Sequence, residues 1–255
     1  MASAGPASPV DWMGTFEPFS VFHALVAVPL IGLMIAASVL GRRWRGTGRE
    51  RVLRVSWGWA SVVMMSGAFV YYGFFDPAFR WDFNLPLQVC DLVAFFAGLA
   101  VLTGNRWLRT VTVFWGLGMC TQAFLTPTVQ VGLGHLHFWY FWLSHTIIVG
   151  SALYLLSVPH YRPGARDYVV ACASLGMYVA LVMPLNIHFE WNYGFVGRSR
   201  PGTTTILDAL GPWPLRVYWL GALSFASMGV VLVITSLVGR WGPGRGGALA
   251  SKLVA

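Results

Sequence analysis

The sequence predicts an all-α membrane protein with seven transmembrane helices, an N-terminus outside the cell and a cytoplasmic C-terminus. Three observations indicate this fold class. Of the 255 residues, 56% are hydrophobic and only 10% are charged, with a mean hydropathy of +0.64, whereas soluble domains carry about 25% charged residues. Apolar stretches of about 20 residues, long enough to cross a bilayer, recur along the chain. Basic residues gather in alternate gaps between these stretches.

Proline and glycine turns separate the apolar stretches and indicate where each expected helix ends. The expected helices lie near residues 20–40, 54–75, 85–103, 107–125, 137–158, 167–185 and 215–238. The first 19 residues contain no Lys or Arg, so they do not resemble a secretory signal. We therefore expect a polar N-terminal segment (1–19), a transmembrane domain (20–238) and a cytoplasmic tail (239–255).

The orientation follows from the distribution of basic residues, because cytoplasmic loops are enriched in Lys and Arg. Thirteen of the 17 basic residues lie in or beside the first, third and fifth gaps or in the tail. The remaining four, in or beside the other gaps, are Arg80, Arg198, Arg200 and Arg216. If the first gap is cytoplasmic, an odd number of helices places the N-terminus outside and the C-terminus inside.

The third expected helix begins with a group of polar residues that an apolar span does not need. Asn84 is a good N-cap, and Pro86 suits a first turn. Cys90 then lies about 8 Å along the axis, where exposed N–H groups and the helix dipole favour a thiolate. Asn84, Gln88 and Asp91 share one helical face. Asp91 is the sole acidic residue in the interior of an expected span, since Asp167 stands at the very edge of another, and this makes it a functional candidate, although a carboxylate bonded to the backbone or to Gln88 has the same sequence signature.

The fifth expected helix carries a histidine at a similar depth. His145 lies about 12 Å along this helix, on the same side of the membrane as Cys90. A cysteine and a histidine at one depth fit an activated thiol nucleophile, and they equally fit a buried histidine bonded to a neighbouring helix. Cys120, near the outer end of the fourth helix, is an alternative partner that would form a disulfide with Cys90. Cys172 is expected to be a packing residue.

The longest gap, residues 186–214, is expected outside the membrane and contains Tyr193 and Asp208. Long loops of membrane proteins often carry function, although a surface loop contacting lipid headgroups has the same composition. We place Tyr193 and Asp208 among the candidate substrate-binding or orienting residues, together with Asn84, Gln88, Asp91 and Gln122.

The chain resembles the YwaF-like integral membrane protein family, to which the eukaryotic transmembrane protein 164 acyltransferase is related. The resemblance covers residues from about 20 to 238 in order. The matching stretches are Leu-Pro-Leu-Gln-Val-Cys-Asp-Leu (85–92), Phe-Trp-Gly-Leu-Gly-Met-Cys-Thr-Gln-Ala-Phe-Leu-Thr-Pro (114–127), Ser-His (144–145), Asn-Tyr (192–193) and Leu-Asp-Ala-Leu-Gly-Pro-Trp-Pro (207–214).

This resemblance implies a multi-helix membrane fold and, from the eukaryotic relative, a phospholipid acyltransferase that carries the acyl group on a cysteine. The matching cysteine is Cys90, and the histidine of the Ser-His pair is His145. Two positions differ from the family pattern: Gln88 stands where a histidine is frequent, and His137 stands where an arginine is common.

The function that this resemblance implies, together with the matched depth of Cys90 and His145, is acyl transfer between membrane phospholipid and lyso-phospholipid through a thioester on Cys90, with His145 as general base and then general acid. No cofactor, metal or nucleic acid is expected, and the location is the cell membrane. The alternatives are a non-enzymatic lipid- or solute-binding transporter, whose polar path would use the same residues, and a structural membrane protein. A rhodopsin-like function is excluded because retinal needs a lysine in the last helix, and the sole lysine, Lys252, lies beyond it. A haem protein is not expected, because no two histidines lie on one helix at a spacing suited to haem ligation.

Overall fold

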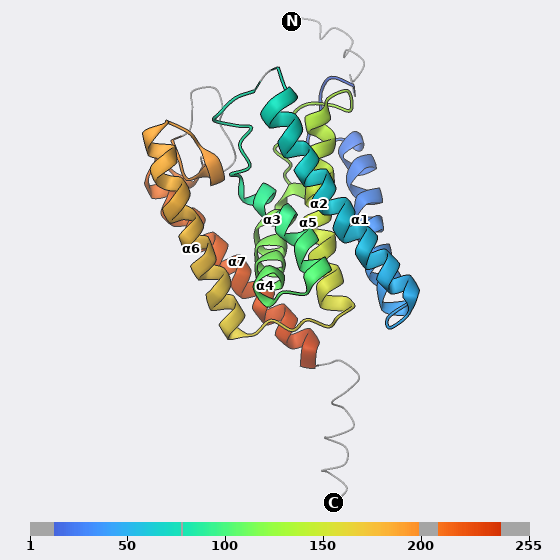
Figure 1. The fold of residues 1–255 in the computed structure, drawn as a ribbon. Helices are drawn as coiled ribbons and strands as arrows, with labels where there is room; N and C mark the ends of the chain where they lie inside the picture. The colour runs from blue at the N-terminus through green and yellow to red at the C-terminus, as the bar shows by residue number, and fades with distance from the viewer. Residues whose placement is uncertain (1–12, 78, 199–208, 241–255) are drawn as a thin grey trace, which may run out of the picture.

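The computed structural model describes residues 13–77, 79–198 and 209–240, and over these residues the chain is a bundle of helices (Figure 1). The number and order of the α-helices agree with the sequence-based expectation. The α-helices are α1 (Val21–Arg43), α2 (Gly48–Val70), α3 (Val89–Thr103), α4 (Arg106–Trp115), α5 (Leu136–Ser157), α6 (Ala165–His188) and α7 (Leu215–Arg240). Short helical turns of other types are η1 (Tyr71–Phe75), η2 (Gly116–Cys120), η3 (Thr121–Phe124) and η4 (Tyr193–Phe195).

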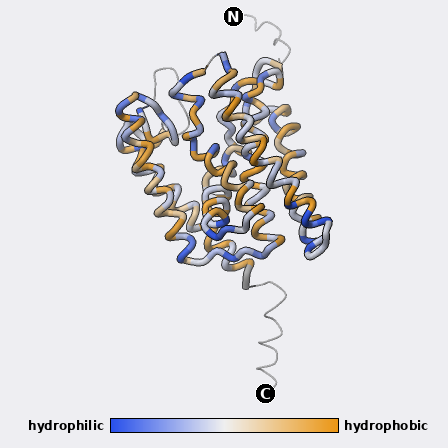
Figure 2. Tube along the Cα trace, viewed as in Figure 1, coloured by the Kyte–Doolittle hydropathy of each residue, from blue (hydrophilic) through white to orange (hydrophobic). Residues whose placement is uncertain are grey.

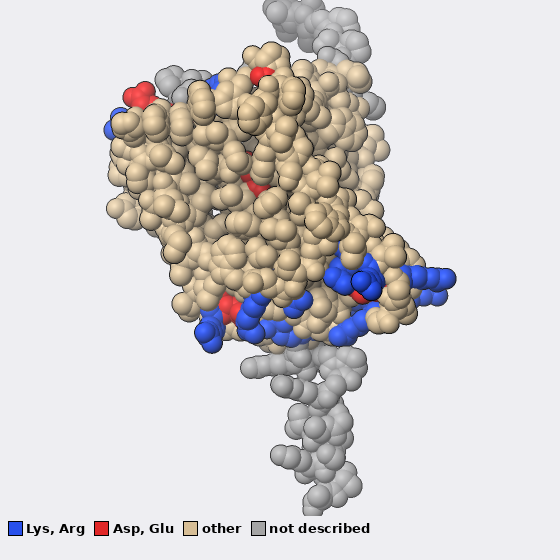
Figure 3. All heavy atoms as spheres, in the orientation of Figure 1, with Lys and Arg blue, Asp and Glu red and all other residues tan. Residues whose placement is uncertain are grey.

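Five of these helices, α1, α2 with η1, α5, α6 and α7, are long and apolar enough to cross a membrane. The other two are shorter, with 15 residues in α3 and 10 in α4. Apolar residues run along the helices and polar residues collect at their ends (Figure 2). The face seen in Figure 3 has almost no charge across its middle, whereas Lys and Arg gather at its lower end. This distribution is that of a multi-pass membrane protein.

The core forms around α5. In the most apolar 18-residue stretch of α5, 67% of the residues are buried inside the protein, whereas in that of α7 only 11% are buried. Helix α7 therefore presents most of its apolar side chains outward. Helix α1 packs on one side of α5, while α3 and α4 pack on the other, and α7 packs against η2. The large side chains buried between these helices include Trp142, Phe138 and Phe114.

One end of the bundle is basic and tightly connected. We call it the basic end; it comprises residues 44–47, 104–105 and 158–164, which join α1 to α2, α3 to α4 and α5 to α6. Gly104 ends α3 in the left-handed conformation (φ 68°), which a glycine adopts without strain. The Asn105 side chain then accepts a hydrogen bond from the Leu108 N–H at 3.1 Å and caps α4. Arg106 binds Asp167 through two contacts of 2.8 Å, which tie α4 to α6.

Helix α3 begins later than expected. The sequence indicated a start near Leu85 with Asn84 as the cap, but α3 begins at Val89 and Gln88 occupies the N-cap position. Residues 79–88 instead form an irregular segment that descends into the bundle before α3 starts (Figure 1). Asn84 lies in this segment, where its side chain accepts a hydrogen bond from the Arg80 N–H at 2.7 Å. Asn84, Gln88 and Asp91 therefore do not share a helical face.

Candidate active site

Tyrosines from distant parts of the chain hold the segment that leads into α3. The Tyr193 hydroxyl accepts a hydrogen bond from the Leu85 N–H at 3.0 Å and donates one to the Trp81 carbonyl at 2.7 Å. The Tyr178 hydroxyl, from α6, donates to the Leu87 carbonyl at 2.7 Å. Burial raises the pKa of Tyr193 to about 12, so its hydroxyl keeps the proton that it donates. These bonds satisfy backbone groups that no helix satisfies.

Gln88 completes this connection. Its side-chain oxygen accepts a hydrogen bond from the Gly194 N–H at 3.0 Å, and Asn186 of α6 binds the Tyr193 backbone through both its amide nitrogen and its amide oxygen. The connection between α6 and α7 therefore fixes the residue immediately before α3. The start of α3 is consequently a defined position in the bundle.

Cys90 is the second residue of α3, closer to the helix start than the sequence indicated. The first-turn N–H groups of a helix have no partner within the helix, and the helix dipole is positive there. Both favour a negative charge on the sulfur. The Cys90 sulfur lies 3.8 Å from that of Cys120. All three cysteines are free thiols, so the Cys90–Cys120 disulfide considered from the sequence is absent.

His145 of α5 lies close enough to Cys90 for the two side chains to interact. Its Nδ1 lies 2.7 Å from the Phe141 carbonyl oxygen. A carbonyl oxygen accepts hydrogen bonds and does not donate them, so Nδ1 carries the hydrogen and, in the neutral ring, Nε2 has the free lone pair. The buried imidazole is therefore in the tautomer that can take a proton from a thiol.

Asp91 has a partner that sequence reasoning missed. The Tyr140 hydroxyl, from α5, donates a hydrogen bond to Asp91 Oδ1 at 2.6 Å. The Tyr72 ring packs edge-on against the Tyr140 ring, with 5.6 Å between the ring centroids. A signal was present in the sequence, because a tyrosine in an apolar span needs a hydrogen-bond partner and Asp91 was the sole carboxylate in the interior of an expected span.

A cavity of about 490 Å³ opens beside Cys90, between the start of α3, η2, α6, η4 and α7. This volume lies in the range of roughly 300–1,000 Å³ typical of ligand pockets. Its polar groups include Gln88, Cys90, Cys120 and Gln122, and most of the remaining lining is apolar. The chemistry of the cavity therefore suits a long apolar ligand with a polar reacting group at the cysteine.

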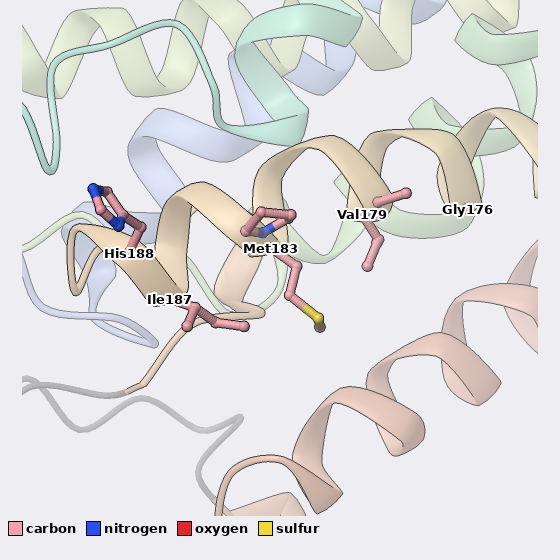
Figure 4. Close-up of a pocket in the computed structure, with 7 residues that line it drawn as sticks. Gly176, Val179, Met183, Ile187 and His188 are labelled. Atoms are coloured by element: carbon pink, nitrogen blue, oxygen red, sulfur yellow. The ribbon is translucent and has the colours of Figure 1, made fainter.

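An open groove of about 620 Å³ adjoins this cavity along α6. The two share Gly176 and Val179 as lining residues. The groove continues over Met183 and Ile187 toward the end of α6, on a face where α7 diverges (Figure 4). Its lining is predominantly apolar, so the cavity at Cys90 extends toward the outside of the bundle along an apolar surface.

The structure brings together most, but not all, of the residues selected from the sequence. Cys90, Gln88 and Gln122 line one cavity, and His145 and Asp91 lie next to Cys90. Tyr193 positions the segment before α3. Asn84 bonds within its own segment, and Asp208 lies outside the described residues. Among the described residues, no three His, Cys, Asp or Glu side chains are grouped as a metal site requires.

No curated protein and no solved structure matched the chain significantly. A family model matched it over residues 18–232, which includes every described part of the site. The description of that family is the TMEM164 family, and the match agrees with the resemblance found in the residues around Cys90 and His145. With the match covering most of the 255 residues, the chain belongs to the TMEM164 family of membrane proteins.

Proposed function

We propose that this protein is an integral membrane phospholipid acyltransferase that carries the acyl group as a thioester on Cys90. The observation that supports this function best is a thiol at a helix N-terminus, paired with a histidine of the correct tautomer, on the wall of an apolar cavity. The apolar cavity and the adjoining groove suit an acyl chain, and the polar groups at Gln88 and Gln122 suit the ester.

In the proposed reaction, His145 Nε2 takes the Cys90 proton as the sulfur attacks the ester carbonyl carbon of a phospholipid. The carbon–oxygen bond of the ester then breaks, and the imidazolium returns its proton to the departing oxygen, which leaves as the hydroxyl of a lyso-phospholipid. The acyl chain remains on sulfur. A second lyso-phospholipid hydroxyl attacks the thioester while His145 takes its proton, and the thiol of Cys90 is regenerated. No oxidant, reductant or cofactor enters this balance.

The neighbouring side chains have supporting roles in this proposal. The Cys120 thiol, 3.8 Å away, can donate its hydrogen to the Cys90 thiolate. Asp91, held by Tyr140, stabilises the imidazolium that forms on His145. Gln88 is held by Gly194, and Gln122 is exposed at the cavity, where its amide can orient an ester or headgroup.

We also propose that all seven helices cross the cell membrane, with the N-terminus outside and the C-terminus in the cytoplasm. The basic end then faces the cytoplasm, in agreement with the enrichment of Lys and Arg in cytoplasmic loops (Figure 3). In this arrangement α3 is short because residues 84–88, all of them partly buried, cover the outer part of its path as irregular backbone, which is tolerated at membrane depth only where protein surrounds it. The reacting groups then lie well inside the bilayer.

The test is intact mass spectrometry of the purified protein after incubation with phospholipid. We expect an adduct of one acyl chain that hydroxylamine removes, and transfer of labelled chains to added lyso-phospholipid. Cys90→Ala should lose both signals, whereas Cys172→Ala, which changes a cysteine outside the cavity, should keep them. Transfer that persists without Cys90 would exclude this mechanism. Lipid or solute flux in proteoliposomes with no adduct would instead support the transporter alternative.

A further inference from the structure

A second cavity, of about 280 Å³, lies at the basic end and shares no residue with the cavity at Cys90. The turn between α1 and α2 contributes Arg45, the start of α2 contributes Glu50 and Arg54, and α4 contributes Arg109. The ends of α3 and α5 complete the lining, including Gly104. Three guanidinium groups and one carboxylate thus face a single small space at the end of the bundle where basic residues gather (Figure 3).

The single carboxylate is already engaged. Glu50 forms an ion pair with Arg54 at 3.3 Å, and it accepts a hydrogen bond from the Tyr154 hydroxyl. Arg45 contacts His160, with 2.9 Å between Nη1 and Nδ1. None of these contacts balances the charges of Arg45 and Arg109. The cavity therefore keeps an excess of positive charge after its internal pairs are counted.

Arg109 is the residue that most clearly indicates a ligand. Its Nε is buried and has no hydrogen-bond partner among the described residues. Its guanidinium lies against Gly104, where a side chain would occupy the same space. A guanidinium group is a rigid, always charged donor that matches the oxygens of phosphate in pairs. The Nε itself is enclosed by protein, so the outer nitrogens of the guanidinium are the ones that an anion in the cavity would meet.

We infer that this cavity binds a phosphate group, carried by an anionic lipid headgroup or present as free inorganic phosphate. Basic pockets between transmembrane helices on the cytoplasmic side are typical binding places for anionic headgroups. The volume of 280 Å³ suits a single phosphate better than a nucleotide. This site is independent of acyl transfer at Cys90, because the two cavities have no lining residue in common.

The experiment uses the purified full-length protein in a neutral detergent, titrated with phosphatidic acid and, separately, with inorganic phosphate, with bound adducts counted by native mass spectrometry. The test variant is Arg45→Gln with Arg109→Gln. The matched control is Arg42→Gln with Arg49→Gln, which removes the same charge from exposed positions of the same end outside the cavity. Size-exclusion profiles establish that each variant is folded.

We expect the test variant to bind its phosphate ligand about tenfold or more weakly, and the control to bind like the wild type. A phosphatidic acid adduct that excess inorganic phosphate does not displace identifies the lipid as the source. Binding of inorganic phosphate alone, with the same loss in the test variant, identifies the free ion. Equal weakening in both variants, or no adduct with either probe, overturns the inference. Should the test variant not fold, Arg45→Gln against Arg42→Gln gives the same comparison, since both arginines are exposed.

Discussion

The polar side chains around Cys90 are costly to place inside a bundle of apolar helices. Moving a neutral polar group such as a hydroxyl from water into an apolar interior without a hydrogen bond costs about 2–7 kcal/mol of free energy, and a carboxylate costs more. Here the groups at the start of α3 have polar neighbours: Asp91 accepts a hydrogen bond from Tyr140, and the Cys90 sulfur lies 3.8 Å from that of Cys120, with His145 beside it. A group of satisfied polar residues at one point in an apolar core marks a place where chemistry, not packing, determines the residue types.

The first prediction concerns the base. In His145→Gln, alkylation of Cys90 by a small maleimide at neutral pH should slow by about tenfold or more, because the imidazole no longer takes the thiol proton. Cys172 is the internal reference, and its rate should be unchanged. Peptide mapping of the labelled protein over time gives both rates. An unchanged rate at Cys90 would show that His145 does not activate the thiol.

The second prediction concerns the Asp91–Tyr140 hydrogen bond. Tyr140→Phe leaves a partly buried carboxylate oxygen without its donor, so we expect the free energy of unfolding to fall by about 1–3 kcal/mol. Tyr71→Phe is the control, since that ring is 39% exposed. Chemical denaturation in detergent measures both. If the hydrogen bond is the cause, Tyr140→Phe should lower the free energy of unfolding by less when Asp91 is already replaced by Asn. An equal decrease in that background would show that the stability is lost through packing.

At the scale of elements, apolar length and turn residues predicted the seven helices, because a bilayer imposes both. The same signals placed the start of α3 too early. Leu85, Pro86 and Leu87 are compatible with a first helical turn, and what decides their conformation is their bonding to Tyr178 and Tyr193, about a hundred residues away. No local pattern contains that information. The pairing of Cys90 with His145 was expected from their similar depth together with the family motifs, whereas Tyr140 required knowing which faces of α3 and α5 meet.

A third prediction tests the close approach of α2 and α3. A methyl group at Gly98 would lie 2.9 Å from the Ser61 Cβ and 3.0 Å from the Gly58 carbonyl oxygen, and a backbone atom has little freedom to move. Gly98→Ala should therefore lower the free energy of unfolding by about 1–3 kcal/mol through overpacking. Gly67→Ala, on α2 with no atom within 4 Å of the new methyl, should be neutral or slightly stabilising. Thermal unfolding of both variants gives the comparison, and equal behaviour would contradict close packing at Gly98.

Across the whole molecule, the two proposed sites lie at different positions along the bundle. The thiol, imidazole and carboxylate meet where α3 begins inside the bundle, next to an apolar cavity between α6 and α7. The arginine-lined cavity lies at the basic end, where α1, α3 and α5 finish. Composition predicted a membrane protein but not either cavity, because a cavity depends on how helices diverge. The divergence of α7 from α6 is visible only once the helices are placed (Figure 4).

The last prediction concerns the orientation of the chain, on which the placement of both cavities depends. Arg49→Cys introduces a thiol at an exposed position near the turn between α1 and α2, and Thr128→Cys introduces one at an exposed position between α4 and α5. Because crossings alternate, these positions face opposite sides of the membrane. In a background with the three native cysteines replaced by alanine, a membrane-impermeant maleimide applied to intact cells should label residue 128 and not residue 49. Residue 49 should react after the cells are permeabilised, which shows that the thiol is accessible.

The physical reason for this orientation is the concentration of arginine near residue 49, which favours retention of that end in the cytoplasm. Labelling of residue 49 alone in intact cells would show that the chain has the opposite orientation, in which the proposed phosphate-binding cavity faces outward.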